Sequence, residues 1–134
     1  MINPMEEISK KAKVLLIIDA IAALIFTVLY LIIPEIYASL IDPLVFDPYY
    51  WRAFGATLLI LAIFGIRAAL GNKEQALFMF EIMILWSIAI VVLNIWELIV
   101  LPLSPTYTET TWFDSILLIV LIILNTYIYF QEKK

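Results

Sequence analysis

The stretch Tyr49–Leu70 reads YYWRAFGATLLILAIFGIRAAL and decides the fold. It is apolar and long enough to cross a hydrocarbon layer about 30 Å thick, which takes roughly 20 residues of helix. Small residues run through it, and Gly55, Ala62 and Ala69 recur at a constant spacing. Small side chains let transmembrane helices approach each other closely. We therefore predict a membrane-spanning helix over residues 48–70 whose small-residue face packs against a neighbouring helix.

Three further apolar runs are each long enough for a span of their own: residues 11–33, 73–101 and 112–130. Of the 134 residues, 65% are hydrophobic and 15% are charged, whereas a soluble domain is nearer half apolar and about a quarter charged. Four spans use most of the chain and leave no room for a soluble domain. We predict an all-α integral membrane protein, a four-helix antiparallel bundle that forms a single domain over residues 1–134.

The connections between the spans carry local signals for helix ends. Asn72 with Gln75 three residues later is typical of a capping box, and Gly71 suits the end of the preceding helix. The two spans on either side of this turn are therefore expected to form an antiparallel hairpin. The other two loops, 34–47 and 102–111, are longer. The first is apolar enough for a short helix that lies along the membrane surface.

Basic residues predict the orientation. Most of them fall on one side of the membrane if both termini share that side: Lys10, Lys11, Lys13, Arg67, Lys73, Lys133 and Lys134. Arg52 falls on the other side. Because basic residues concentrate on the cytoplasmic side, we predict a multi-pass protein of the cell membrane with both termini in the cytoplasm and both long loops outside. Aromatic residues expected at the outer interface would act as anchors: Tyr49, Tyr50, Trp51, Trp96, Tyr107 and Trp112.

The composition argues against catalysis. The chain contains neither histidine nor cysteine, which removes the commonest metal ligand, the commonest general base near neutral pH and all thiolate chemistry. It has no glycine-rich phosphate-binding motif. Its basic residues are few and lie beside the membrane, unlike those of a nucleic-acid-binding surface. We predict a non-catalytic protein with no cofactor, no metal and no nucleic-acid partner.

Polar residues inside the spans form two predicted levels. Counting about 1.5 Å per residue places Asp19, Arg67, Glu81 and Asn125 at nearly the same depth near the inner surface. We expect Arg67 to pair with one or both acids, Asn125 to hydrogen-bond nearby, and Tyr129 to join them. Ionisable groups at such depth are costly, and they mark either a functional site or a paired contact. The cluster is therefore a polar pocket, an interhelical clamp, or a set of side chains that snorkel to the interface.

The outer level contains Arg52, Asn94, Glu97 and Asp114. Arg52 is expected to anchor its helix at the interface or to pair with Glu97. One stripe of the last span joins the two levels and is expected to face the bundle interior: Asp114, Leu118, Leu121, Asn125 and Tyr129.

Part of the chain resembles a known group of proteins. Residues 50–56, YWRAFGA, lead into Leu58 and Leu59 and towards Arg67, and Pro34 follows the first span. This pattern resembles the second helix of small uncharacterised four-helix membrane proteins of the broad DoxX-like kind. The resemblance implies a four-helix bundle. It provides no catalytic residues to transfer, because that group has no single activity.

Two classes of function fit these observations. The first is non-catalytic: the protein binds a lipid or another amphiphile between its helices, or it packs as a structural accessory subunit of a larger membrane complex. Its partners are then membrane lipids, a partner membrane subunit or further copies of the chain. The second is a small transporter or an ion-conducting oligomer that uses its membrane carboxylates, Asp19 and Glu81.

Overall fold

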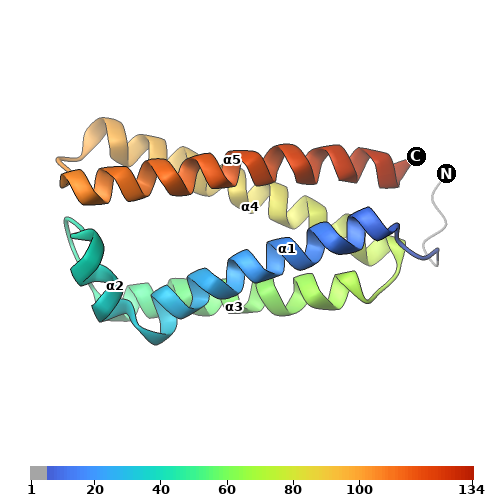
Figure 1. The fold of residues 1–134 in the computed structure, drawn as a ribbon, viewed down its shortest axis with the longest axis horizontal. Coiled ribbons are helices and arrows are strands. Elements are labelled where there is room, and N and C mark those ends of the chain that lie inside the picture. Colours follow the sequence, from blue (N-terminus) through green and yellow to red (C-terminus); the bar gives the residue numbers. More distant parts are fainter. Residues whose placement is uncertain (1–5) are drawn as a thin grey trace.

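The computed structural model describes residues 6–134, and residues 1–5 of the predicted domain lie outside this range. The elements are α1 (Lys10–Thr27), the π-helix η1 (Val28–Ile32), α2 (Pro34–Ile41), α3 (Pro48–Ala69), α4 (Lys73–Val100) and α5 (Pro105–Lys133). Four helical segments are long and apolar enough to span a membrane: α1 with η1, α3, α4 and α5. The start of α1 and the end of α5 lie at one end of the molecule, the terminal end, and α2 lies at the other, the α2 end (Figure 1).

The last helix begins earlier than predicted. We expected a loop over residues 102–111 and a helix from 112, but α5 begins at Pro105. Ser104 caps this helix, since its Oγ accepts a hydrogen bond from the backbone nitrogen of Tyr107 at 3.2 Å. Proline at the first helical position and serine before it are standard start signals. The threonine-rich stretch read as a loop is thus the first turns of α5.

The first span is not a uniform α-helix. It was predicted as one helix over residues 11–33, but its last turn is the π-helix η1. Pro34 then opens α2, which agrees with the short helix that the sequence allowed in this loop. Asp42 ends α2 in the left-handed conformation, with φ of 53°. Its carbonyl oxygen accepts a hydrogen bond of 2.8 Å from Ser104 Oγ, which ties α2 to the start of α5.

The tight turn between α3 and α4 follows the prediction in part. The capping box is confirmed: Asn72 Oδ1 accepts from the backbone nitrogen of Gln75 at 3.0 Å, and Gln75 Oε1 accepts from that of Asn72 at 3.2 Å. Gly71 does not have a positive φ, and Leu70 is the C-cap of α3. The glycine therefore does not end the helix by a left-handed conformation.

The four long helices pack as two pairs. α1 packs mainly on α3 and α4 mainly on α5, and contacts between the pairs are fewer. In Figure 1, α1 and α3 run together below α4 and α5, and the pairs approach each other towards the terminal end. A short turn connects α3 and α4, as expected for a hairpin. These two helices nevertheless pack on each other less than α1 packs on α3 or α4 on α5.

The small-residue face of α3 packs against α1, as predicted. Gly55, Ala62 and Ala69 are all buried, and so is Gly65. A β-carbon added at Gly55 would lie 2.7 Å from the backbone nitrogen of Leu31, so η1 and α3 touch backbone to backbone. This contact explains why a residue without a side chain is needed there.

The main core lies at the terminal end. Phe80 and Leu16 are its largest fully buried apolar side chains, and Ala12, Ala69 and Ala76 pack beside them. The chain before α1 adds to this end, because the backbone nitrogen of Lys73 donates to the carbonyl oxygen of Glu6 at 2.8 Å. Lys73 Nζ also lies 3.2 Å from Glu6 Oε2.

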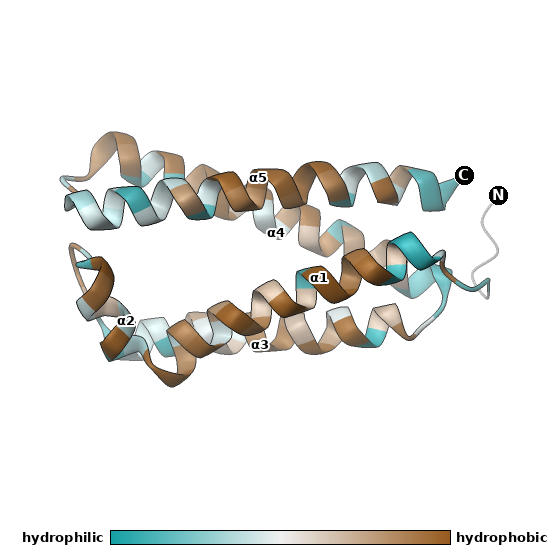
Figure 2. Ribbon diagram, viewed as in Figure 1, coloured by the Kyte–Doolittle hydropathy of each residue, from teal (hydrophilic) through white to brown (hydrophobic). Residues whose placement is uncertain are grey.

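The outer surfaces of the helices are largely apolar. Figure 2 shows brown, hydrophobic ribbon along most of their length and teal, hydrophilic residues near both ends of the bundle. Large side chains such as Ile25, Leu85, Ile99 and Phe113 are more than half exposed. An apolar surface around the whole bundle is what a lipid environment requires.

The backbone contact at Gly55 generates a stability prediction. Gly55→Ala should lower the free energy of unfolding by about 1–3 kcal/mol, because the added methyl group forces backbone to move in a packed region. The measurement is thermal or detergent-induced unfolding of the purified protein in mild micelles.

Gly65→Ala is the matched control. A β-carbon there would lie 3.5 Å from the nearest atom, Ala20 Cβ, which is ordinary contact. Alanine also favours helix over glycine by up to about 1 kcal/mol, so this variant should be as stable as the wild type or more so. Equal stability of both variants would show that η1 and α3 do not approach as closely as described.

Candidate functional site

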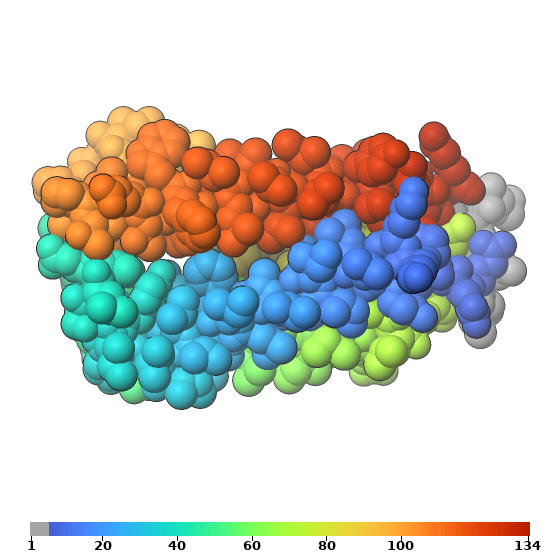
Figure 3. Space-filling model, in the orientation of Figure 1, coloured from blue at the N-terminus to red at the C-terminus, as the bar shows by residue number. Residues whose placement is uncertain are grey.

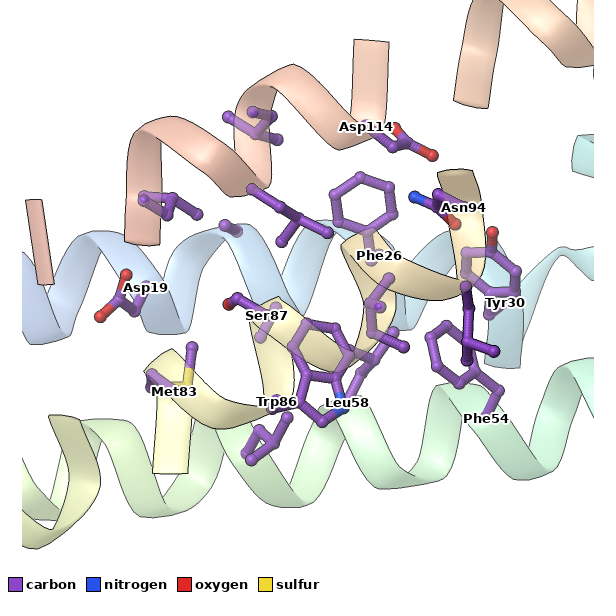
Figure 4. Close-up of a pocket in the computed structure, with 18 of the residues that line it drawn as sticks. Asp19, Phe26, Tyr30, Phe54, Leu58, Met83, Trp86, Ser87, Asn94 and Asp114 are labelled. Atoms are coloured by element: carbon purple, nitrogen blue, oxygen red, sulfur yellow. The ribbon is translucent and has the colours of Figure 1, made fainter. Parts of the chain in front are cut away.

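A cavity of about 250 Å³ lies between the two helix pairs. Side chains from all four spans line it, as Figure 4 shows for ten labelled residues. Asp19 lies towards one end of it, and Asn94, Asp114 and Tyr30 lie towards the other (Figure 4). Asp19 and Tyr30 are three turns apart along the first span, roughly 16 Å at 1.5 Å per residue. The cavity is therefore elongated along the bundle.

Asp19, which lines the cavity at its end away from α2, contacts Asn125. Asp19 is 1% exposed and Asn125 is 2% exposed. Asn125 Nδ2 donates to Asp19 Oδ1 at 3.0 Å and to the carbonyl oxygen of Leu121 at 2.7 Å. This contact links α1 to α5 between the two helix pairs, as the predicted proximity of Asp19 and Asn125 requires.

Two acceptor oxygens of this pair have no hydrogen-bond partner. They are Asp19 Oδ2 and Asn125 Oδ1, and both are buried. A buried polar atom without a partner costs free energy, and such atoms are rare in folded proteins. Of the two residues, Asp19 lines the cavity. The free oxygen of Asp19 therefore lacks a hydrogen-bond donor that a molecule in the cavity could provide.

The α2 end of the cavity is also polar. Asn94 Nδ2 donates to Ser115 Oγ at 3.2 Å, and Tyr107 OH donates to Glu97 Oε2 at 3.2 Å. Asp114 lines the same end. Asn94, Glu97 and Asp114 were predicted to share the outer level, and the structure brings all three to one cavity.

Aromatic rings form much of the wall between these polar ends. Tyr30 and Phe54 meet edge to face with ring centroids 5.0 Å apart, and Phe54 stacks on Trp86 at 6.2 Å. Phe26 lies 6.4 Å from Tyr30. The π-helix η1 carries Tyr30, and π-helical turns are frequent at functional sites. The middle of the cavity is thus apolar and well suited to a hydrocarbon or an aromatic ring.

A second hollow, a groove of about 680 Å³, runs between α1 and α5. Figure 3 shows the seam between these two helices, blue and orange, along which the groove lies. The groove shares wall residues with the cavity: Ala22, Phe26, Asp114 and Leu117. Exposed apolar side chains such as Ile21 and Ile25 form its outer part. The groove therefore connects the cavity wall to the surface that lipid would cover.

The predicted pairing of Arg67 is wrong. In the part of the chain that the structure describes, Arg67 forms no ion pair with Asp19 or Glu81, and its side chain is exposed. The face of α3 that packs on α1 is made of small residues, and Arg67 lies on another face. Glu81 instead accepts a hydrogen bond of 2.6 Å from Tyr129 OH on the exposed surface. The residues predicted to share the inner level therefore form two separate pairs, Asp19 with Asn125 and Glu81 with Tyr129, and Arg67 is exposed.

The predicted pairing of Arg52 with Glu97 is also wrong. Arg52 Nη2 lies 2.8 Å from Glu35 Oε1 and 3.0 Å from Oε2, which ties α2 to α3. The pKa of Glu35 is lowered by hydrogen bonds from backbone at the start of α2 and from Arg52. Burial raises the pKa of Tyr37, whose ring packs on those of Tyr30 and Trp51, to about 12. Arg52 therefore belongs to the α2 end of the fold and not to the cavity.

Sequence reasoning missed the aromatic wall. Trp86, Phe54, Phe26 and Tyr30 had been given no role in a site, although Trp86 lies in the middle of a predicted span and so cannot be an interface anchor. The sequence predicts Tyr107 to be an interface anchor, but in the structure it donates to Glu97 beside the cavity. The position of Trp86 in the middle of a predicted span was the signal in the sequence that this tryptophan belongs to the interior.

The chain matches no family model, no curated protein and no solved structure. The resemblance to DoxX-like proteins therefore stays a prediction.

The Asp19–Asn125 contact generates a second prediction. Asn125→Ala should lower the free energy of unfolding by about 1–3 kcal/mol, because Asp19 stays buried without its donor. Replacing both residues by leucine should restore stability to within about 1 kcal/mol of the wild type, since neither polar group then remains unpaired. Unfolding in micelles measures both variants.

Tyr129→Phe is the control for this pair. It removes a hydrogen bond at the exposed surface, so its effect should stay within about 0.5 kcal/mol. If Asn125→Ala has no larger effect than this control, the buried pair does not hold the two helix pairs together.

Proposed function

We propose that this protein is a non-catalytic, multi-pass protein of the cell membrane that holds an amphiphilic molecule from the bilayer inside its helical bundle. The observation that carries the proposal is the elongated cavity with polar residues at both ends and an apolar, aromatic middle. Binding sites for small molecules are typically concave and mostly apolar, with a few polar groups that fix orientation. This arrangement matches a ligand with a polar head and an apolar body.

The groove between α1 and α5 supports entry from the bilayer. Its outer part consists mostly of exposed apolar side chains, with Glu109 and Thr110 from α5, and its inner part is the cavity wall at Ala22 and Phe26. An amphiphile dissolved in the membrane can pass along such a groove without meeting water. The apolar lining thus favours a lipid-soluble ligand over a water-soluble one.

The packing at the terminal end favours binding over conduction. Beyond Asp19, the bundle is filled by core side chains such as Leu16, Phe80 and Ile128. A transporter or channel needs a polar path that continues to the other surface, and this core occupies that position. The carboxylates therefore fit a site that is closed on one side.

Ligand binding is tested by native mass spectrometry after purification in a mild detergent. The wild-type protein should carry about one amphiphile per chain. Ser87→Leu should reduce the bound fraction at least tenfold, because Ser87 is buried in the cavity wall and leucine would fill the space.

Ala89→Leu is the matched control, since Ala89 lies on the exposed side of the same helix and should leave the bound fraction unchanged. Equal loading of both variants, or a wild-type protein without any bound molecule, would contradict the proposal. A membrane subunit that co-purifies in equal amounts would favour the accessory-subunit hypothesis instead.

We also propose that both termini lie in the cytoplasm. The wild-type chain has no cysteine, so single-cysteine variants give a clean test with a reagent that does not cross membranes. Lys134→Cys should be labelled only after the cells are opened, and Thr106→Cys, at the α2 end, should be labelled on intact cells. The reverse pattern would mean that the protein is inserted the other way round.

A further inference from the structure

We infer that the cavity selects an amphiphile whose head is a protonated amine, and that Asp19 receives the N–H groups of this head. This inference rests on the proposed function and names the chemical class of its ligand. It starts from the charges that surround the cavity.

Three carboxylates line the cavity: those of Asp19, Glu97 and Asp114. Among residues 6–134, no lysine or arginine contributes to its wall. In a region of low dielectric, like charges raise each other's free energy unless a cation is nearby. The cavity is therefore selective for positive charge, and it would repel the phosphate or carboxylate head of an anionic lipid.

Asp19 is the residue that fixes the head group. It is 1% exposed, and its Oδ2 has no hydrogen-bond partner. Within the described part of the chain it also has no ion-pair partner, because the predicted partner Arg67 lies exposed on another face of α3. Ionisable residues inside membrane proteins usually face a cavity or pair with one another or with backbone, and they mark ligand or ion sites. An ammonium group supplies both the missing charge and the missing donor.

The other walls match the rest of such a ligand. Met83 and Ser87 lie between Asp19 and the aromatic residues in Figure 4, so an apolar body that starts at Asp19 runs towards Phe26 and Trp86. Aromatic faces also attract cations, which helps an ammonium group to pass them on its way inward. The acids at the α2 end, Glu97 and Asp114, add attraction along that path.

A metal ion fits these residues poorly. In residues 6–134, no group of three or more acidic side chains lies close enough together to hold a metal. Asp19 is separated from Asp114 by most of the length of the cavity, as Figure 4 shows. The spacing suits an elongated organic cation, with one carboxylate at its head.

The test compares two probes that share an alkyl chain, octylamine and 1-octanol, by titration calorimetry in uncharged maltoside micelles at pH 7. Octylamine is protonated at this pH, as a lysine side chain is. The wild-type protein should bind octylammonium at least tenfold more tightly than 1-octanol. Asp19→Asn should remove this preference and leave the affinity for 1-octanol within twofold, because asparagine keeps the shape of the side chain.

Two variants and a third probe complete the design. Glu81→Gln neutralises an acid outside the cavity wall and should keep the preference, whereas Ser87→Leu should abolish binding of both probes. Octyltrimethylammonium carries the charge without N–H groups, so the wild type should bind it at least threefold more weakly than octylammonium. This last comparison needs no variant, and it decides the role of N–H donation even if Asp19→Asn does not fold.

The unfavourable results separate the two proposals. Equal affinity of the wild type for octylammonium and 1-octanol, with both lost in Ser87→Leu, would overturn the selectivity for amines and leave the amphiphile site standing. Loss of the preference in Asp114→Asn but not in Asp19→Asn would overturn the role of Asp19. Binding of neither probe, or binding that Ser87→Leu does not change, would overturn the proposed function itself.

Discussion

The close approach of α3 to the backbone of η1 is the contact on which the rest of the bundle depends. Without a hydrophobic effect to drive helices together in lipid, packing at short range provides much of the attraction, and small residues make it possible. Gly55 provides this contact where η1 widens the first span, and Gly65 and Ala62 continue it towards the core. Because α1 packs along α3, it contacts α4 and α5 mainly towards the terminal end. The cavity lies in the remaining space between the two helix pairs.

Polar side chains divide between holding the bundle together and lining the space inside it. Arg52 with Glu35, and Ser104 with Asp42, join elements at the α2 end, and the Arg52 and Glu35 side chains are exposed there. Asp19 is different, because it is buried in the middle of the molecule with one oxygen unpaired. A protein that needed only stability would place an apolar residue there. Its presence at the end of an aromatic cavity is why we interpret it as part of a site.

Much of the fold was predictable from local features of the sequence. The four spans follow from length and hydropathy, the capping box from Asn72 and Gln75, and the packing face of α3 from the recurrence of small residues. The partners of the charged residues were not predictable, because the position of a residue along a helix does not tell which neighbouring helix its side chain faces. Arg67 was predicted at about the depth of Asp19, but it lies on another face. Arg52 pairs with Glu35 of α2, a short helix that the sequence indicated only as a possibility. The start of α5 was missed because threonine-rich polar turns look like a loop until Ser104 and Pro105 are read as a start signal.

The short turn at residues 70–72 divides the chain so that each tightly packed helix pair is contiguous in sequence. α1 and α3 are complete at Ala69, before the first residue of α4 is synthesised. Chains are made from the N-terminus at about 5–20 residues per second, so α1 and α3 are made seconds before the last residues of α5. The backbone contact at Gly55 can therefore form on the ribosome, as an assembly step of its own. The cavity forms after this contact, since it is enclosed only when α4 and α5 pack against the first pair.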